Sequence, residues 1–340
     1  MNPMKPTLFG CYNIGQGFDF HNLVIRNGSK ASDECISSSY PEIMKNYDHA
    51  VEDFNKPSEH GNAKDWWTHP DFAPPQSSSQ MLDPLRKEKL KSVFELMRNN
   101  CDIILLQEIV EDVEFVKTSI GENFGFSYKM SSEDNRGRIG DALVCWNKEK
   151  FEKIKIIGKK ETSQESDERC RTRSAIVRLR EKSTNKIFDV ASVHVPGYYI
   201  KEPTEKNVVN GENAVKLLNK VLLLNKDNPA DISIVAGDFN SDANPTYYDS
   251  EDKLALSQRR FKLLTDKGFK RVVNNQTTAY NPDIAKLKIG NGECVLDHIF
   301  VKSGKNIASE PQLLLEGDFH FSLEDPSKNP SDHLPLFFKV

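Results

Sequence analysis

Two short polar segments beside apolar runs carry residue types suited to cleaving a phosphate ester. Gly237-Asp238-Phe239-Asn240-Ser241 follows an apolar run, and Ser331-Asp332-His333-Leu334-Pro335 precedes another. Each segment places an acid beside a group that can orient a phosphate or a water. Together they predict metal-assisted hydrolysis of a phosphate ester.

The first segment supplies a candidate base and a candidate hydrogen-bond donor. Asp238 and Asn240 are two residues apart, so in an extended chain their side chains face the same side. We expect Asp238 to accept a proton from, or to align, the attacking water. The Asn240 amide is expected to donate to a phosphoryl oxygen as charge develops on it. The alternative is a local Asx-type turn beside Gly237.

The ends of two further apolar runs carry candidate metal ligands. Glu108 follows the run 103–106, and a hard cation such as Mg²⁺ needs only one or two protein carboxylates. Glu108 is therefore the expected main ligand, the alternative being a surface glutamate. Asn13 closes the first predicted strand, and its amide is expected to hold Glu108 or a metal-bound water. Asp332 would add a second carboxylate near the metal.

The histidines are expected to act on the phosphate. We expect Asp297 to end the apolar run 294–296 and to fix the tautomer and charge of His333. His194 ends another predicted strand and is expected to contact the scissile phosphate, although a lone histidine there is more often structural. His298 is expected to point away from Asp297 and to lie outside the site.

Substrate contacts are predicted from arginine and aromatic side chains. Arg169, Arg171 and Arg173 alternate along a predicted strand and so share one face, where they can bind phosphates. The alternative is a solvated sheet edge, where charges oppose aggregation. Tyr198, in an insertion at 197–211, offers a surface on which a base can stack.

The apolar patterns predict alternating strands and helices. We expect strands over residues 8–13, 102–107, 141–147, 171–180, 187–195, 232–236, 295–301 and 334–339, and helices over 85–97, 208–224 and 258–267. This alternation predicts α/β layers in which two sheets pack face to face between helices. Residues 18–80 lack this periodicity but contain Trp66-Trp67, so we expect a folded insertion near the active face rather than a loosely attached loop.

Composition limits the classes of partner. The 340 residues carry a net charge of −4, which argues against a large nucleic-acid-binding basic surface but permits a nuclease that uses bound cations. None of the six cysteines forms a C-x-x-C pair, so we expect buried thiols and a reducing compartment. We see no signal-peptide pattern and no run of about 20 apolar residues, so a cytoplasmic or otherwise intracellular location is expected.

The order of these motifs along the chain resembles the endonuclease/exonuclease/phosphatase superfamily, to which DNase I belongs. The resemblance spans residues 8–340 apart from 18–80, and it rests on Asn13, Gln107-Glu108, His194, Gly237–Asn240, Leu296-Asp297 and Ser331–His333. It implies one domain over 1–340, with an insertion at about 18–80. The implied fold is a four-layer α/β/β/α sandwich, in which two packed mixed sheets are flanked by helices.

The resemblance also implies the chemistry. Members hydrolyse phosphoesters with Mg²⁺, or Mn²⁺, by in-line attack of water. The family pattern makes Glu108 the metal ligand, helped by Asn13 and Asp332. It makes Asp238 the group that activates water, Asn240 and His194 the groups that stabilise the transition state, and Asp297 the residue that orients His333.

The substrate is less narrowly predicted. Residues 141–146, 237–247 and 331–336 are most similar to the CCR4/nocturnin-like branch, and His298 replaces an arginine of the DNase I branch. We therefore expect a phosphodiesterase or nuclease acting on nucleic acid. The alternatives are a phosphatase or phospholipase-type hydrolase of a phosphoinositide, sphingomyelin or other phosphorylated small molecule, and a non-catalytic binding module. The intact acids and histidines count against the last.

Overall fold

The structure is a computed structural model. It describes residues 6–14, 88, 90–109, 113–127, 142–157, 174–195, 211–212, 215–216, 218, 228–242, 251–272, 278–280, 293–304, 312–314, 331 and 333–340. The chain divides into two compact units, one of Met1–Gly17, Val93–His320 and Ser331–Val340, the other of Phe18–Ser92 and Phe321–Pro330. All strands given below belong to the first unit. Outside the described residues lie the predicted insertion at 18–80, the predicted ligand Asp332, and the predicted substrate contacts Arg169, Arg171, Arg173 and Tyr198.

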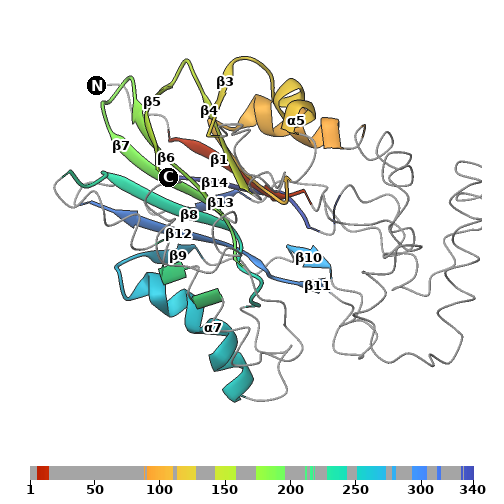
Figure 1. Cartoon of the computed structure of the whole chain (residues 1–340), viewed down its shortest axis with the longest axis vertical. Coiled ribbons are helices and arrows are strands. Elements are labelled where there is room, and N and C mark those ends of the chain that lie inside the picture. Colours follow the sequence, from red (N-terminus) through yellow and green to blue (C-terminus); the bar gives the residue numbers. More distant parts are fainter. Residues whose placement is uncertain are drawn as a thin grey trace, which may run out of the picture. The chain divides into compact units, whose positions relative to one another are not determined.

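Within the described residues, one six-stranded sheet has the order β13-β14-β1-β2-β4-β3 (Figure 1). Its strands are β1 (Leu8–Asn13), β2 (Ile103–Gln107), β3 (Phe124–Phe126), β4 (Ala142–Asn147), β13 (Gln312–Leu314) and β14 (Leu336–Lys339). β1 and β2 are parallel, with Asn13 beside Gln107, and the other pairs are antiparallel. Every residue of β2 is buried, as expected for a strand covered on both faces.

A second six-stranded sheet in the described part of the chain has the order β5-β6-β7-β8-β12-β9. Its strands are β5 (Phe151–Ile157), β6 (Ser174–Glu181), β7 (Ile187–His194), β8 (Ile232–Asp238), β9 (Lys270–Val272) and β12 (Asp297–Ser303). β7 and β8 are parallel, and His194 lies beside Asp238 at their ends. β12 runs antiparallel to β8, so its first residue, Asp297, lies on the other side of Asp238. A short pair, β10 (Ala279–Tyr280) and β11 (Glu293–Cys294), stands apart from both sheets.

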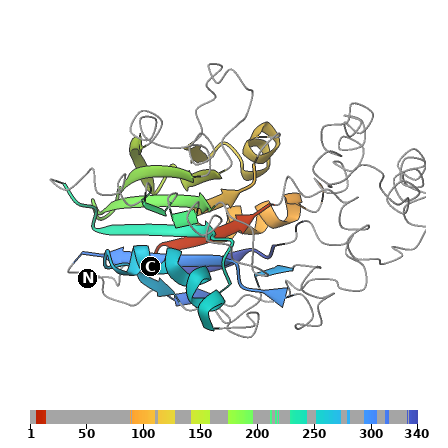
Figure 2. The same ribbon diagram turned by 60° about the horizontal axis from the view of Figure 1, so that its bottom comes forward.

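The two sheets pack face to face through one apolar core. The core takes buried side chains from both sheets, among them Phe9, Ile103 and Val144 from the first and Val190 and Ile234 from the second. Figure 2 shows the strands of both sheets between the helices. The carboxyl ends of the two parallel pairs can therefore contribute to one site.

Helices cover the outer faces of the sheets. α7 (Glu251–Thr265) and the helical residues of 211–218 cover the second sheet, where Leu218, Phe261 and Leu264 pack with Val235 and Phe300. On the first sheet, Met97 of the helix at 90–100 lies directly over Gly10, where an added methyl carbon would come within 2.9 Å of its Cε. α5 (Val113–Ile120) packs beside this helix, and Figure 1 shows α5 and α7 on opposite sides of the sheets. The predicted four-layer α/β/β/α sandwich is confirmed.

Some element boundaries differ from the sequence prediction. Asp297 begins β12 instead of ending a strand, because its pairing with Asp238 is the first rung of a ladder that continues to Ser303. His333 does not open β14; it makes an isolated bridge with Ala279, and β14 begins at Leu336. α7 begins at Glu251, well before the predicted residue 258. Among the described helices, none is long and apolar enough to cross a bilayer.

Candidate active site

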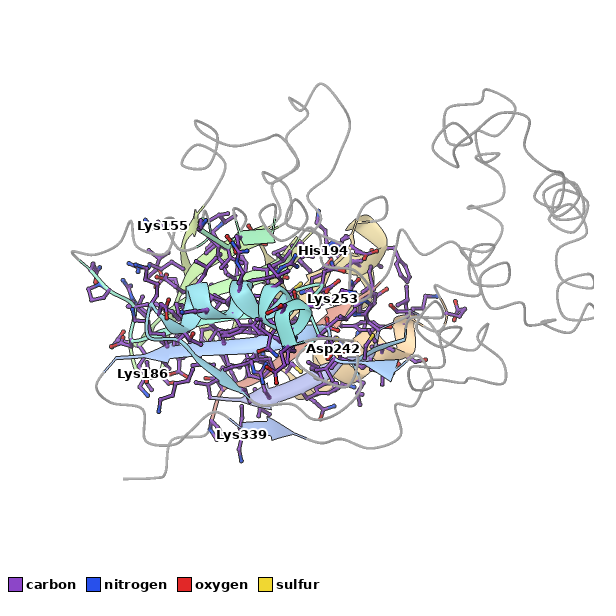
Figure 3. The ribbon with its side chains drawn as sticks, turned by 90° about the horizontal axis from the view of Figure 1, so that it is seen from below. Lys155, Lys186, His194, Asp242, Lys253 and Lys339 are labelled. Atoms are coloured by element: carbon purple, nitrogen blue, oxygen red, sulfur yellow. The ribbon has the colours of Figure 1, made fainter. Side chains whose placement is uncertain are left out.

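Seven of the predicted site residues meet where the parallel strand pairs end. Asn13 and Glu108 come from the ends of β1 and β2, His194 and Asp238 from those of β7 and β8, and Asn240, Asp297 and His333 from segments beside them. In Figure 3, His194 and Asp242 lie toward this end of the sheets, and Lys186 and Lys339 toward the other. The predicted positions outside the described residues are Asp332, the three arginines and Tyr198.

Glu108 reaches the site through a sharp turn at the end of β2. Its φ of 57° lies in the left-handed region, which costs a non-glycine residue about 1–3 kcal/mol. The turn brings Glu108 Oε1 within 3.2 Å of Asn13 Nδ2. Asn13 is fully buried, and the same Nδ2 lies 3.2 Å from Asp238 Oδ2 and 3.4 Å from His333 Nε2. These contacts exclude a plain surface role for Glu108 and place Asn13 at the centre of the site.

Asp238 and Asn240 form an Asx turn. Asn240 has a φ of 48°; its backbone N–H donates to Asp238 Oδ1 at 2.6 Å, and its Nδ2 donates to Asp238 Oδ2 at 3.2 Å and to the Val195 carbonyl at 3.1 Å. The turn is the alternative considered for this segment, and it still brings the two predicted side chains together. The extended backbone from which this was predicted is wrong, because a left-handed residue closes the turn instead.

Gly237 permits the close approach of β7 and β8 just before this turn. Its φ is 146°, and a Cβ built there would lie 2.0 Å from the Val193 carbonyl oxygen. Any other residue would separate the two strands or bend β8. Glycine at this position therefore keeps His194 and Asp238 side by side.

His333 and Asp297 form the predicted pair. His333 Nδ1 lies 2.7 Å from Asp297 Oδ2, and both side chains are buried. Because a carboxylate can only accept, the proton lies on Nδ1 in neutral His333. Nε2 then faces the site, 3.9 Å from Asp238 Oδ2. The pair can hold a proton on Nε2 when His333 is charged, with Asp297 opposing the charge.

Thr278 positions both members of this pair and was missed by sequence reasoning. Its Oγ1 accepts from the backbone N–H groups of Leu296 at 2.9 Å and Asp297 at 3.0 Å, and its carbonyl accepts from Leu334 N at 2.7 Å. One buried residue thus binds the segment before β12 and the segment that carries His333. A threonine in a polar stretch offers no pattern from which this role can be predicted.

A second unpredicted contact joins the sheets beneath the site. The buried Gln107 Nε2 donates to Ser192 Oγ at 2.7 Å, and Ser192 Oγ donates to the Leu106 carbonyl at 2.8 Å. Gln107 precedes Glu108, and Ser192 lies two residues before His194. This bridge links the two strand ends that carry those side chains.

Glu108, His194 and Asp238 form a group that can hold a metal ion. One ligand atom from each lies within 4.8 Å of the others. His194 Nε2 is 3.6 Å from Asp238 Oδ2 and 3.8 Å from Glu108 Oε1. His194 was predicted to contact the phosphate and Asp238 to activate the water, and both lie beside the predicted metal ligand Glu108.

The electrostatics of Asp238 favour a cation at this group. Burial raises the pKa of Asp238 from 3.8 to about 6, although His333 and His194 oppose the rise; Asp297 adds to it. A carboxylate that is costly to ionise alone is stabilised by a nearby cation. The two carboxylates are the oxygen ligands that a hard divalent ion takes, and they leave room for the several waters that Mg²⁺ retains. The residues therefore fit a hard divalent ion.

Comparisons with known proteins give the family and the fold of the chain. The model of the Endonuclease/Exonuclease/phosphatase family matches residues 79–333. SmcL is 12% identical with a TM-score of 0.53 over 98% of this chain and 99% of its own. An endonuclease/exonuclease/phosphatase from Bacteroides vulgatus is 13% identical, with a TM-score of 0.51 over 99% and 98%. A humanized D. rerio TDP2 is 13% identical, with a TM-score of 0.50 over 98% of each chain. No curated protein sequence matches the chain significantly. At these identities the structures show a shared fold alone.

Proposed function

This chain belongs to the endonuclease/exonuclease/phosphatase family, and from that premise we propose that it is a divalent-metal-dependent phosphodiesterase acting on nucleic acid. The family match and the group of Glu108, His194 and Asp238 identify the chain as a phosphoester hydrolase of this family. Its dependence on a metal and its action on nucleic acid are proposed.

The observation that carries the proposal is the surrounding of Asp238. A buried carboxylate with a pKa near 6 stands among two amides, two histidines and a second acid. Such a carboxylate is ionised at neutral pH, yet basic enough to take a proton from water. His194 can donate to an oxygen on which negative charge develops, and charged His333 can do so through Nε2. Asn240 would do the same by giving up one of its amide hydrogen bonds to Asp238 and Val195.

A divalent cation would fit on the Glu108 carboxylate, which Asn13 fixes, next to Asp238 and His194, leaving Asp238 open to the attacking water and His194 open to the phosphate. Such a cation would neutralise the negative charge that develops on the phosphoryl group. The protein's own part is to exclude water from the buried side of the site and to keep Asp238, Asn240 and His333 aligned. We propose Mg²⁺, with Mn²⁺ as a substitute.

Nucleic acid is proposed as the substrate because of sequence similarity in short motifs and a set of arginines. Residues 237–247 and 331–336 are most similar to the CCR4/nocturnin-like branch, and Arg169, Arg171 and Arg173 are proposed to bind phosphates. The net charge of −4 favours a second candidate, a phosphatase or phospholipase-type hydrolase, because that activity needs no basic surface. We also propose an intracellular location, supported by the buried thiols of Cys11 and Cys145.

A substrate panel tests the proposal. The purified protein is assayed with Mg²⁺ or Mn²⁺, and with EDTA, on single-stranded RNA, duplex DNA, a phosphoinositide and sphingomyelin, with Asp238→Asn as the matched inactive control. The expected result is EDTA-sensitive cleavage of a nucleic acid by the wild type alone. Cleavage of only a lipid would overturn the substrate class, and equal activity of Asp238→Asn would overturn the site.

A further inference from the structure

We propose that Arg260 and His298 are positioning residues that hold residues 239–242, here called the catalytic loop, in the conformation that aims Asn240 at Asp238. The inference deepens the proposed function and rests on it for its activity readout. Neither residue belongs to the predicted site. Their contacts run to backbone carbonyl groups and not to the reacting side chains.

Arg260 binds the first two carbonyl groups of the catalytic loop. It lies in α7, is 3% exposed, and its Nη1 donates to the Phe239 carbonyl at 2.5 Å and to the Asn240 carbonyl at 3.3 Å. The guanidinium group is planar and stays charged, so it holds such acceptors in a fixed direction. Because this buried arginine binds carbonyl groups of the loop, it fixes the position of the loop relative to α7.

Gly211 makes room for this guanidinium group. A Cβ built on Gly211 would lie 2.5 Å from Arg260 Cζ, so any side chain there would have to displace the guanidinium group. The next residue, Glu212, is buried and pairs with both Lys216 and Arg259, so its charge keeps a partner when Arg259 is replaced. The Arg260 guanidinium group therefore lies between Gly211 and the catalytic loop, and more than one contact sets its orientation.

His298 binds the third carbonyl group. Its Nε2 donates to the Ser241 carbonyl at 2.8 Å, and its ring packs edge-on against Phe261, with centroids 4.5 Å apart. Burial lowers the pKa of His298 to about 4, although its backbone hydrogen bonds with Ser241 and Val295 oppose the fall, so the ring is neutral near pH 7. The predicted exclusion of His298 from the site agrees with this placement.

These contacts together determine the shape of the catalytic loop. The carbonyls of Phe239, Asn240 and Ser241 each accept from Arg260 or His298, and the Phe239 N–H donates to the Leu296 carbonyl at 2.9 Å. Asn240 itself sits in the left-handed region at a φ of 48°, which a non-glycine residue keeps only when its surroundings impose it. Without the two donors, Asn240 can relax and turn its amide away from Asp238.

The test compares Arg260→Met with Arg259→Met. Both remove one arginine charge from the same turn of α7, but Arg259 is 39% exposed and pairs with Glu212 instead of the loop. With a substrate that the wild type hydrolyses, we expect kcat to fall about 100-fold in Arg260→Met, the effect of moving a catalytic group by about 1 Å. KM should stay within about threefold, and Arg259→Met should keep its kcat. Arg260→Lys keeps the charge but has a shorter side chain, so its kcat should lie between those of the two methionine variants.

A second variant displaces the guanidinium group without removing it. Gly211→Ala is favourable for a helix, so its loss of kcat would come from the added methyl group pressing on Arg260. Because both changes act through one contact, the double variant Gly211→Ala/Arg260→Met should be no slower than Arg260→Met alone. Multiplying losses would overturn the inference, as would a folded Arg260→Met with wild-type kcat.

Amide hydrogen exchange separates this inference from the proposed function. The Asn240 N–H bonds to Asp238 Oδ1, so it should be protected in the wild type and Arg259→Met. It should lose about 100-fold in protection in Arg260→Met and in His298→Phe, which keeps the ring shape but not the donor. If the wild type hydrolyses nothing, the proposed function fails, and unchanged protection in both variants would still overturn the positioning role.

Discussion

Exchanging Asp238 for asparagine should change how stability depends on pH while abolishing hydrolysis. The folded-state pKa of Asp238 is raised by burial from 3.8 to about 6. The folded protein therefore binds this proton more tightly than the unfolded chain does. The resulting stabilisation is complete below pH 3.8 and is lost as the pH rises through 6. Asparagine carries no proton to lose, so the variant escapes that loss.

The magnitude follows from the two pKa values. One pKa unit corresponds to about 1.4 kcal/mol, so ionised Asp238 costs the metal-free fold about 3 kcal/mol above pH 6. About 2 kcal/mol of this falls between pH 4.5 and pH 7.5. In the wild type, Asn13 Nδ2 and Asn240 Nδ2 donate to Asp238 Oδ2, and an asparagine amide group at that position could not accept these hydrogen bonds. Losing them lowers the stability of the variant equally at both pH values, so this effect cancels when the two pH values are compared.

The assay is urea unfolding in EDTA at pH 4.5 and pH 7.5. The free energy of unfolding of Asp238→Asn, relative to wild type, should rise by about 2 kcal/mol between the two pH values. Asp266→Asn, which removes an exposed acid after α7, is the control and should show no such rise. Adding Mg²⁺ at pH 7.5 should stabilise the wild type much more than Asp238→Asn. A relative stability that is the same at both pH values would refute this account of Asp238.

Three further substitutions examine separate parts of the site. Glu108→Gln should raise the Mg²⁺ concentration needed for half-maximal activity about 10- to 100-fold, and an unchanged metal titration would place the ligand elsewhere. Asp297→Asn removes the charge partner of His333 and should lower kcat about 100-fold or more; a wild-type kcat would show that the pair has no catalytic role. Gly237→Ala should destabilise the protein by about 3 kcal/mol or more in urea unfolding, because its Cβ would lie 2.0 Å from the Val193 carbonyl oxygen; wild-type stability would contradict the close approach of β7 and β8.

The sequence was most informative where strands are buried on both faces. The runs at 103–106 and 232–236 are almost wholly apolar, and their ends carry Glu108 and Asp238, so the strand and the site were predicted together. Short edge strands such as β3, β9 and β13 have three residues each, too few for an alternating pattern. Their pairing depends on neighbouring strands and not on local propensity.

Within the site, side-chain identity was more predictable than backbone shape. The pairing of Asp297 with His333 was predicted because a histidine near phosphate needs a carboxylate partner, and the two are hydrogen-bonded. The left-handed turn at Glu108 was not predicted, because glutamate rarely adopts a positive φ. At Asn240 a turn was only the alternative, although asparagine is one of the residues enriched at positive φ. Thr278 and Arg260 act through backbone groups brought together only by folding, and they lie in no motif.

The most direct test of metal-dependent hydrolysis at this site is turnover of an activated phosphodiester, bis(4-nitrophenyl) phosphate, because it needs no natural substrate. Wild type and Asp238→Asn are compared with added Mg²⁺ or Mn²⁺ and with EDTA. We predict release of nitrophenol by the wild type with metal, none with EDTA, and none from Asp238→Asn in either condition. Hydrolysis that survives EDTA, or that Asp238→Asn retains, would contradict a metal-assisted reaction centred on Asp238.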